Sequence, residues 1–349
     1  MRRHRTAAGI LLTVTALFTG GLVQAGAADA VPAATPSGPP AATHTTPATG
    51  RATARTTPAT EGAAAHTAPV TDQRKARTFW TAERMRGATP LDLLLTRQAA
   101  RTLKAPEPHG SPTTVAPTQA LASFPQAGGP WTGGGAAVTT SGRVFFTFQG
   151  RTASCTGNAI TSQNASTVIT AGHCVKYQGS WHTNWVFVPA YDNGSAPYGQ
   201  WTAAKTLTTP QWEASEDINY DVGAAVVAPL NGKTLTSVVG AQGIQFNGGY
   251  NKPMYSFGFP AASPYDGTKL IYCSGNSSKD FLFSQDHSLG CNMTGGSSGG
   301  PWFTGFDEAT GTGLQVSVNS FGYVFLPNRM FGPYFGDVVK SLYDRAQTS

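Results

Sequence analysis

The sequence predicts an all-β fold for residues 131–349. In this region short apolar runs alternate with clusters of Gly, Asn, Pro and Ser, as in short strands joined by turns. The composition agrees, because the 349 residues include 41 Gly and 24 Pro, and only 12% are charged. A typical soluble domain has about 25% charged residues. We assign strands to the runs at 144–146, 168–169, 185–188, 224–227, 255–257, 270–272 and 314–321.

The end of the chain departs from this strand pattern. Phe335, Val338, Val339, Leu342 and Tyr343 have the spacing of one face of a helix. We therefore expect an amphipathic C-terminal helix over residues 335–346.

Residues 1–30 have the features of a secretory signal peptide. Arg2, Arg3 and Arg5 precede an apolar run, and small residues follow at 25–30. A membrane anchor is the alternative, but Thr and Gly interrupt the run, which is shorter than the roughly 20 residues that span a bilayer. We expect a secreted, extracellular protein that has no membrane association once the signal is removed.

The stretch between the signal and the β region has three parts. Residues 31–71 are mostly Ala, Thr, Pro and Gly and predict a disordered spacer. Residues 72–104 contain Phe79 and Trp80 and predict a packing segment, in which Pro90 separates two short helical stretches. Residues 105–130 predict a linker. This order is typical of a pro-segment docked on a secreted enzyme at 131–349; a stalk that tethers the protein to a surface is the alternative.

The net charge of +6 is unevenly distributed. Residues 131–349 carry 11 basic and 12 acidic side chains, so the excess lies in the N-terminal part that we expect to be removed. Because no basic helix or aromatic-basic repeat accompanies it, we expect no binding to nucleic acid.

The four cysteines all lie in the β region. An even number in an exported chain indicates two disulfides, for which three pairings are possible. A zinc site would need closely spaced ligands, which are absent here. Sequential pairing closes two short loops, and we expect Cys155–Cys174 and Cys273–Cys291.

Three segments carry the residue types of nucleophilic catalysis. His173 follows a predicted strand and precedes Cys174, so a disulfide would anchor the loop that holds its ring. Asp221 stands directly before an apolar strand, where a buried carboxylate needs a partner. Ser298 lies in the run GGSSGGP, where glycines allow the sharp turn that aims backbone N–H groups beside a hydroxyl. Each segment alone also fits a structural role. His173 could be a core histidine, Asp221 could cap a turn, and the segment around Ser298 could be a flexible loop.

Together these segments resemble those of chymotrypsin-like serine peptidases, and in particular the bacterial secreted branch that includes glutamyl endopeptidases. The stretches TAGHC and GGSSGGP carry most of the likeness over residues 131–349. The stretch FWTAERMRGATPLD also resembles pro-segments ahead of such enzymes. The resemblance implies two antiparallel six-stranded β-barrels with the active site between them, followed by a C-terminal helix.

The resemblance also implies roles for single residues. His173, Asp221 and Ser298 would form the catalytic triad, in the order His, Asp, Ser. The N–H groups of Gly296 and Ser298 would form the oxyanion hole. Asp217 is the second candidate for the acid, whereas His182 lies in an expected surface loop.

Two positions depart from the trypsin pattern, and both are neutral. Ser297 stands where trypsin has an Asp that pairs with a new N-terminus, so we expect no such activation switch. Asn292 stands at the expected base of the substrate pocket, which argues against strict Lys or Arg specificity. Ser320, Phe321 and Gly322 resemble the strand that pairs with the substrate backbone. No His precedes the Phe-Gly pair, unlike in glutamyl enzymes.

The function predicted from the sequence is therefore a secreted serine endopeptidase that acts on proteins or peptides and binds its own pro-segment. We expect a monomer with no cofactor and no metal. An α/β-hydrolase is excluded because its His must follow the Ser, and no His follows Ser298. The alternatives are a catalytically silent binding module of the same fold and a carbohydrate-binding domain that uses Trp181, Trp185 and Trp201.

Overall fold

The computed structural model describes residues 62–95, 101, 110–115 and 125–349. The chain divides into two units, residues 1–57 and 58–349, and all described residues belong to the second. The predicted signal peptide and most of the predicted spacer therefore lie outside the described residues. Among the described residues, no helix has the length and apolar character needed to cross a membrane.

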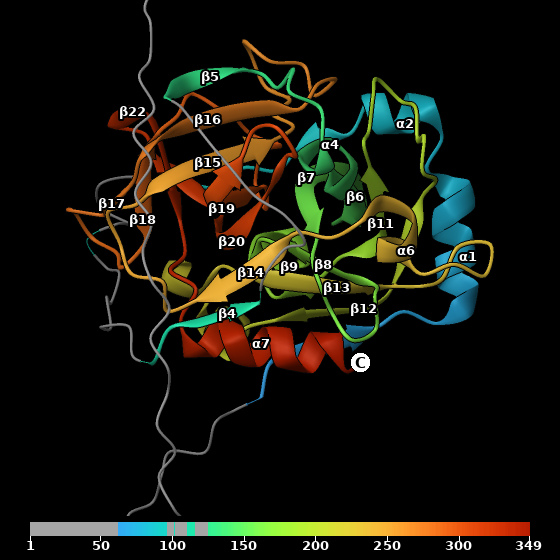
Figure 1. Cartoon of the computed structure of the whole chain (residues 1–349). Helices are drawn as coiled ribbons and strands as arrows, with labels where there is room; N and C mark the ends of the chain where they lie inside the picture. The colour runs from blue at the N-terminus through green and yellow to red at the C-terminus, as the bar shows by residue number, and fades with distance from the viewer. Residues whose placement is uncertain (1–61, 96–100, 102–109, 116–124) are drawn as a thin grey trace, which may run out of the picture. The chain divides into compact units, whose positions relative to one another are not determined.

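A closed six-stranded antiparallel barrel forms the first half of the β region (Figure 1). Its strands follow one another around the barrel, and β11 pairs back with β6 to close it. In that order they are β6 (Ser141–Phe148), β7 (Arg151–Ala159), β8 (Thr167–Thr170), β13 (Gly223–Val227), β12 (Trp201–Thr208) and β11 (Thr183–Pro189).

Side chains alternate across the barrel wall, as a period of two requires. Val144 and Phe146 of β6 lie in the core inside the barrel, whereas Phe145 between them lies in a second apolar cluster outside it. Trp80 and Met85, from the region ahead of the barrel, belong to that outer cluster. The apolar outer face of the barrel is therefore covered in part by the N-terminal segment and in part by aromatic residues of the second half, such as Phe257 and Phe303.

The second half of the β region consists of two sheets. One has seven strands in the order β4-β14-β20-β19-β15-β16-β5, and the other has five in the order β17-β18-β22-β21-β3. Their bounds are β3 (Leu94–Leu95), β4 (Thr113–Val115), β5 (Gln126–Pro130), β14 (Gly243–Phe246), β15 (Pro253–Gly258), β16 (Ile271–Asn276), β17 (Ser278–Lys279), β18 (His287–Gly290), β19 (Pro301–Asp307), β20 (Thr312–Val318), β21 (Phe321–Tyr323) and β22 (Leu326–Gly332). With the closed barrel, these sheets agree with the two-barrel arrangement that the sequence led us to expect.

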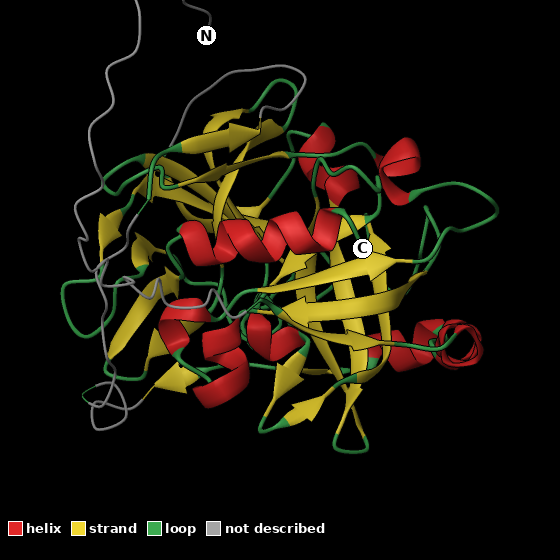
Figure 2. Ribbon diagram, turned by 90° about the horizontal axis from the view of Figure 1, so that it is seen from below, coloured by secondary structure: helices red, strands yellow, loops and turns green. Residues whose placement is uncertain are grey.

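The C-terminal helix is confirmed as α7 (Asp337–Gln347). Val339, Leu342 and Tyr343 pack into the core of the first barrel. Figure 2 shows α7 lying across the strands, with the C-terminus at its end.

Short elements complete the β region, namely α4 (Ala136–Thr140), η1 (Gly172–Cys174), β9 (Lys176–Tyr177), β10 (Ser180–Trp181), α5 (Pro210–Ser215), η2 (Ile218–Tyr220) and α6 (Leu235–Val239).

The N-terminal segment of residues 62–95 is ordered against the β region. It consists of β1 (Ala64–Thr67), α1 (Val70–Phe79), α2 (Ala82–Arg86), β2 (Thr89–Pro90) and β3. The predicted disordered spacer thus ends earlier than expected, because β1 adds to the edge of β12 and gains backbone hydrogen bonds that composition does not reveal. The prediction for Pro90 is also wrong, because the two helices are separated at Trp80 and Thr81, and Pro90 lies in β2.

Part of the expected linker also lies in the sheets. β4 pairs with β14, and β5 pairs with β16. Trp131 follows β5 and packs edge-on against Phe257, Tyr272 and Phe306. Residues 126–131 therefore belong to the packed β region.

Candidate active site

His173 lies in η1, at the end of β8. Gly172 before it approaches its neighbours closely, since a Cβ there would stand 2.8 Å from Trp212 Cγ and 2.9 Å from Asp221 Oδ1. Cys174 after it is joined to Cys155 of β7. Both predicted disulfides, Cys155–Cys174 and Cys273–Cys291, are confirmed.

Asp221 holds the ring of His173 in one orientation. His173 Nδ1 lies 2.7 Å from Asp221 Oδ2, and the backbone N–H of His173 donates to Oδ1 at 2.7 Å. Both side chains are fully buried. Because the carboxylate accepts a hydrogen bond from Nδ1–H, the ring proton stays on Nδ1 and Nε2 remains as the basic nitrogen, which is the tautomer that a general base requires.

Ser320 provides the third hydrogen bond to this carboxylate, through Oγ to Asp221 Oδ2 at 2.6 Å. The Ser320 side chain thus supports the Asp221 carboxylate. The backbone of the same residue is the part that we expected to lie beside the substrate. The second candidate, Asp217, does not reach His173. Asp217 instead caps the start of η2, where its Oδ1 accepts from the backbone N–H of Asn219. The structure therefore brings Asp221, and not Asp217, to the imidazole.

Ser298 lies in the tight loop between residues 294 and 300. Gly299 has φ of +81°, and a Cβ at this position would lie 2.1 Å from Thr170 Oγ1, so only glycine fits. The Ser298 carbonyl accepts from Thr156 N of β7 at 2.7 Å and lies 3.7 Å from the disulfide sulfur of Cys174. The loop is thereby tied to the strand and the disulfide that also anchor the His173 loop.

Asn319 is a residue that the sequence analysis missed. It is fully buried, and its Nδ2 donates to the carbonyls of Ser297 and Phe257. Its Oδ1 accepts from Ser256 Oγ and Trp302 Nε1, each at 2.7 Å. A single amide side chain thus joins the loop of Ser298 to two strands, β15 and β19. The only sequence signal that could have pointed to Asn319 was its polar side chain within the buried run 314–321.

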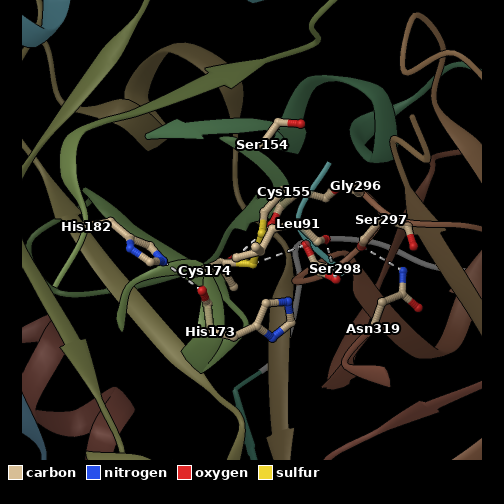
Figure 3. Close-up of a disulfide and its surroundings, with 12 residues drawn as sticks. Leu91, Ser154, Cys155, His173, Cys174, His182, Gly296, Ser297, Ser298 and Asn319 are labelled. Atoms are coloured by element: carbon tan, nitrogen blue, oxygen red, sulfur yellow. Dashed lines mark hydrogen bonds between the residues drawn. A yellow bond between two sulfur atoms is a disulfide. The ribbon is translucent and has the colours of Figure 1, made fainter. Parts of the chain in front are cut away.

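The prediction that His182 lies in a surface loop is wrong. His182 is buried, its ring stacks on Phe146, and its Nε2 donates to the His173 carbonyl at 2.8 Å (Figure 3). The acceptor is a carbonyl, so Nε2 must carry the proton. Burial lowers the pKa of His182 from 6.5 to about 4, and the ring is therefore neutral at pH 7.

The remaining predicted site residues surround the Ser298 loop. Ser297 Oγ donates to the Thr294 carbonyl, which closes the loop without a charge. Asn292 Oδ1 accepts from Tyr265 Oη at 2.6 Å, and its backbone N–H donates to Ala127 of β5. Phe321 is buried in an apolar cluster, and Gly322 N donates to the Leu93 carbonyl at 3.0 Å.

The segment 62–95 also reaches this site. Gly296 N lies 3.3 Å from the Leu91 carbonyl oxygen, and Ser298 Oγ lies 3.4 Å from the same atom. Figure 3 shows Leu91 over Ser298, beside the disulfide. His173 Nε2 is buried and has no hydrogen-bond partner among the described residues.

The tryptophans that could have formed a carbohydrate site do not line an open surface. Trp185 and Trp201 are buried, and their Nε1 groups donate to the Cys174 and Tyr198 carbonyls. Trp181 stacks on His66 of β1. The tryptophan arrangement therefore offers no support for carbohydrate binding.

No family model matches the chain. The chain resembles the extracellular metalloprotease of Bacillus subtilis (strain 168), with 35% identity over 82 residues. That match covers 23% of this chain and only about a quarter, 25%, of the relative. In the described part of this chain, the one group of possible metal ligands is Cys155, His173 and Cys174. The two sulfurs are joined to each other, so these residues do not fit a metal ion.

Solved structures match over a much larger part. The protease Anisep from Arthrobacter nicotinovorans is 46% identical, with a TM-score of 0.58, and the match covers 61% of this chain and 97% of that protein. The thermostable serine protease AL20 from an extremophilic microorganism is 40% identical, with a TM-score of 0.58 and coverage of 61% and 99%. A Glu endopeptidase is 16% identical, with a TM-score of 0.51 and coverage of 65% and 98%, and shows the fold alone. These comparisons support a protease function.

Proposed function

Because the chain belongs to the chymotrypsin-like serine proteases, we propose that it is a secreted serine endopeptidase with His173, Asp221 and Ser298 as its catalytic triad. The observation that carries the proposal is the fully buried pair of His173 and Asp221, which leaves Nε2 basic at a loop tied to that of Ser298. Two disulfides and the predicted signal peptide support secretion.

The proposed reaction is acyl transfer to Ser298. Oγ attacks the scissile carbonyl carbon while His173 Nε2 takes its proton, and the C–N bond breaks as Nε2 returns that proton to the leaving amine. Water then hydrolyses the acyl-enzyme by the same route. The N–H groups of Gly296 and Ser298 would stabilise the oxyanion, and removal of one such donor typically lowers kcat by about 10²–10³-fold.

We propose that residues 62–95 are the pro-segment of this enzyme. They cover part of the apolar outer face of the first barrel, and their Leu91 carbonyl stands beside Gly296 and Ser298. Because β5 and Trp131 pack in the second half, the mature chain would begin ahead of Gln126.

The test uses the secreted, processed protein and a reagent that labels active-site serines. We expect labelling of Ser298 in the natural sequence, and loss of both labelling and at least about 10⁴-fold of kcat in Ser298→Ala. The matched control is Ser297→Ala, which should keep the label because its hydroxyl donates to Thr294. If Ser298→Ala still hydrolyses protein, the triad is wrong. If the natural sequence takes no label, the chain is a silent binding module.

A further inference from the structure

Residues 89–95 cross the candidate active site as an extended chain bound to both halves of the β region. On the first barrel, β2 pairs with β7, and Leu91 N donates to the Ser154 carbonyl at 3.0 Å. On the second half, β3 pairs with β21, and Gly322 N donates to the Leu93 carbonyl at 3.0 Å. The chain therefore fills the groove in which a peptide substrate would have to lie.

The contacts of the Leu91 carbonyl group do not suit attack by Ser298 Oγ on its carbon. Its oxygen is the acceptor for Gly296 N and for Ser298 Oγ, so the serine hydroxyl points its proton at the carbonyl oxygen. For acyl transfer, that proton must point at His173 Nε2, and Oγ must face the carbonyl carbon. His173 Nε2 instead has no partner among the described residues. The carbonyl occupies one of the two proposed oxyanion donors, the Gly296 N–H, without an activated nucleophile.

The direction of the chain gives a second reason. Both pairings, β2 with β7 and β3 with β21, are parallel. A peptide laid in the same groove in the opposite direction would exchange the positions of the Cα and N substituents on the bound carbonyl. Only one of the two directions can present the leaving nitrogen to His173 and the correct carbonyl face to Ser298. His173 Nε2 has no hydrogen bond to Ser298 Oγ while the Leu91 carbonyl is bound, which favours the parallel direction as the unproductive one.

Strong anchors lie on both sides of Leu91. Leu93 is buried among Trp212, Phe321 and Tyr323. Upstream, Trp80 is 1% exposed, its Nε1 donates to the Asn184 carbonyl at 2.6 Å, and its own carbonyl accepts from Gln200 Nε2 at 2.8 Å. Because burial and hydrogen bonds hold the chain at both ends, the ends would stay bound if the centre were disturbed.

We propose that residues 89–95 are a built-in inhibitor that binds the active-site groove in a direction that Ser298 does not cleave. This proposal rests on the proposed function and concerns its regulation. Activation then requires a cut outside 89–95 and release of the intact strand. The same strand, added in trans, should inhibit the mature enzyme without being consumed.

The first experiment measures the rate of serine labelling in the unprocessed secreted chain. Leu93→Asp places a carboxylate in the apolar cluster and should raise that rate by at least about tenfold. The matched control is Val70→Asp, the same kind of change at a residue that is 58% exposed at the start of α1, and it should leave the rate unchanged. Equal labelling of the unprocessed and mature natural chains would overturn the proposal, whereas no labelling of either would instead remove the proposed function.

The second experiment does not depend on folding of a variant precursor. A synthetic polypeptide of residues 62–95 is added to the mature enzyme, and products are identified by mass spectrometry. We expect inhibition that persists and no cut between residues 89 and 95. The control polypeptide has residues 89–95 in reverse order and should inhibit at least about tenfold more weakly or be cleaved. Cleavage of the natural strand between Leu91 and Asp92, or equal inhibition by the reversed strand, would contradict the proposal.

Discussion

The two halves of the β region hold their parts of the candidate site in different ways. In the first barrel, His173 is fixed by the Asp221 carboxylate, by the disulfide at Cys174 and by the ring of His182. In the second half, Ser298 depends on a glycine-rich loop tied to the neutral amide of Asn319. The proposed base is thus placed by charge and covalent structure, and the proposed nucleophile by hydrogen bonds.

This difference tells us what each half can tolerate. Asp221 accepts from both the ring and the backbone N–H of His173, so replacement by an amide of the same shape changes the tautomer of the ring and can keep the backbone hydrogen bond. Loss of a buried amide leaves several donors and acceptors unpaired, so a change at Asn319 acts on stability and on the shape of the loop. Substitutions in the two halves should therefore separate effects on rate from effects on folding.

The largest expected effect is on the first barrel. In Asp221→Asn, the new amide can donate to Nδ1 and force the proton onto Nε2, so His173 can no longer accept from Ser298. We expect kcat to fall by about 10⁴-fold with little change in the free energy of unfolding. Steady-state kinetics and urea denaturation of the processed enzyme measure both.

Asp217→Asn is the control for this prediction, because Asn begins a helix about as well as Asp and Asp217 does not contact the ring. Its kcat should stay within about twofold of the natural value. A loss at Asp217→Asn as large as that at Asp221→Asn would assign the acid to the wrong residue.

The next largest effect is expected in the second half of the β region, at Asn319. Asn319→Ala leaves two buried donors, Ser256 Oγ and Trp302 Nε1, and the carbonyls of Ser297 and Phe257 without their partner. We expect the free energy of unfolding to fall by roughly 2–4 kcal/mol, and kcat to fall as well because the Ser298 loop loses its support. Denaturation curves and active-site titration of the folded fraction separate the two effects.

Asn158→Ala is the matched control for Asn319→Ala. Asn158 is also fully buried, and its Nδ2 donates to Gln315 Oε1 at 2.9 Å, but among the described residues its side chain makes no hydrogen bond to the Ser298 loop. It should lower stability and leave kcat per folded molecule unchanged. If both variants lower kcat equally, Asn319 has no special role in placing the nucleophile.

Local sequence patterns predicted much of the fold. The turn-separated runs predicted the strands, and the spacing of Val339, Leu342 and Tyr343 predicted α7, because both periodicities report directly which face is buried. The short separation of the cysteines was enough to predict their pairing. The need of a strand-leading carboxylate for a partner pointed to Asp221, which does pair with His173.

Contacts between distant residues could not be read in the same way. His182 has polar and aromatic neighbours in sequence, and its burial comes from Phe146 and from the carbonyl of His173. Pro90 is a helix breaker in isolation, but an extended edge strand accepts a residue without an N–H, and β7 provides the partner. Asn319 stood out only as a polar residue within a buried run, and its role could not be inferred because its four partners come from other strands and from the Ser298 loop.

The smallest expected effect concerns pH and the support behind the base. Burial lowers the pKa of His182 from 6.5 to about 4, so the unfolded chain takes up a proton on this ring at a pH at which the folded chain does not. The contribution of the neutral ring is therefore complete above pH 6.5 and is lost as pH falls toward 4. Over that range we expect the free energy of unfolding to fall by about 3 kcal/mol from this residue.

His182→Gln isolates this contribution from the other groups that titrate in acid. Its amide can still donate to the His173 carbonyl but has no charge to gain, so its stability should fall less steeply between pH 6.5 and 4 than that of the natural chain. Buried His287, whose pKa is lowered to about 3, is common to both proteins and cancels in the difference. Urea denaturation at several pH values provides the two curves. Parallel curves would mean that burial does not lower the pKa of His182 and that the ring makes no pH-dependent contribution to stability.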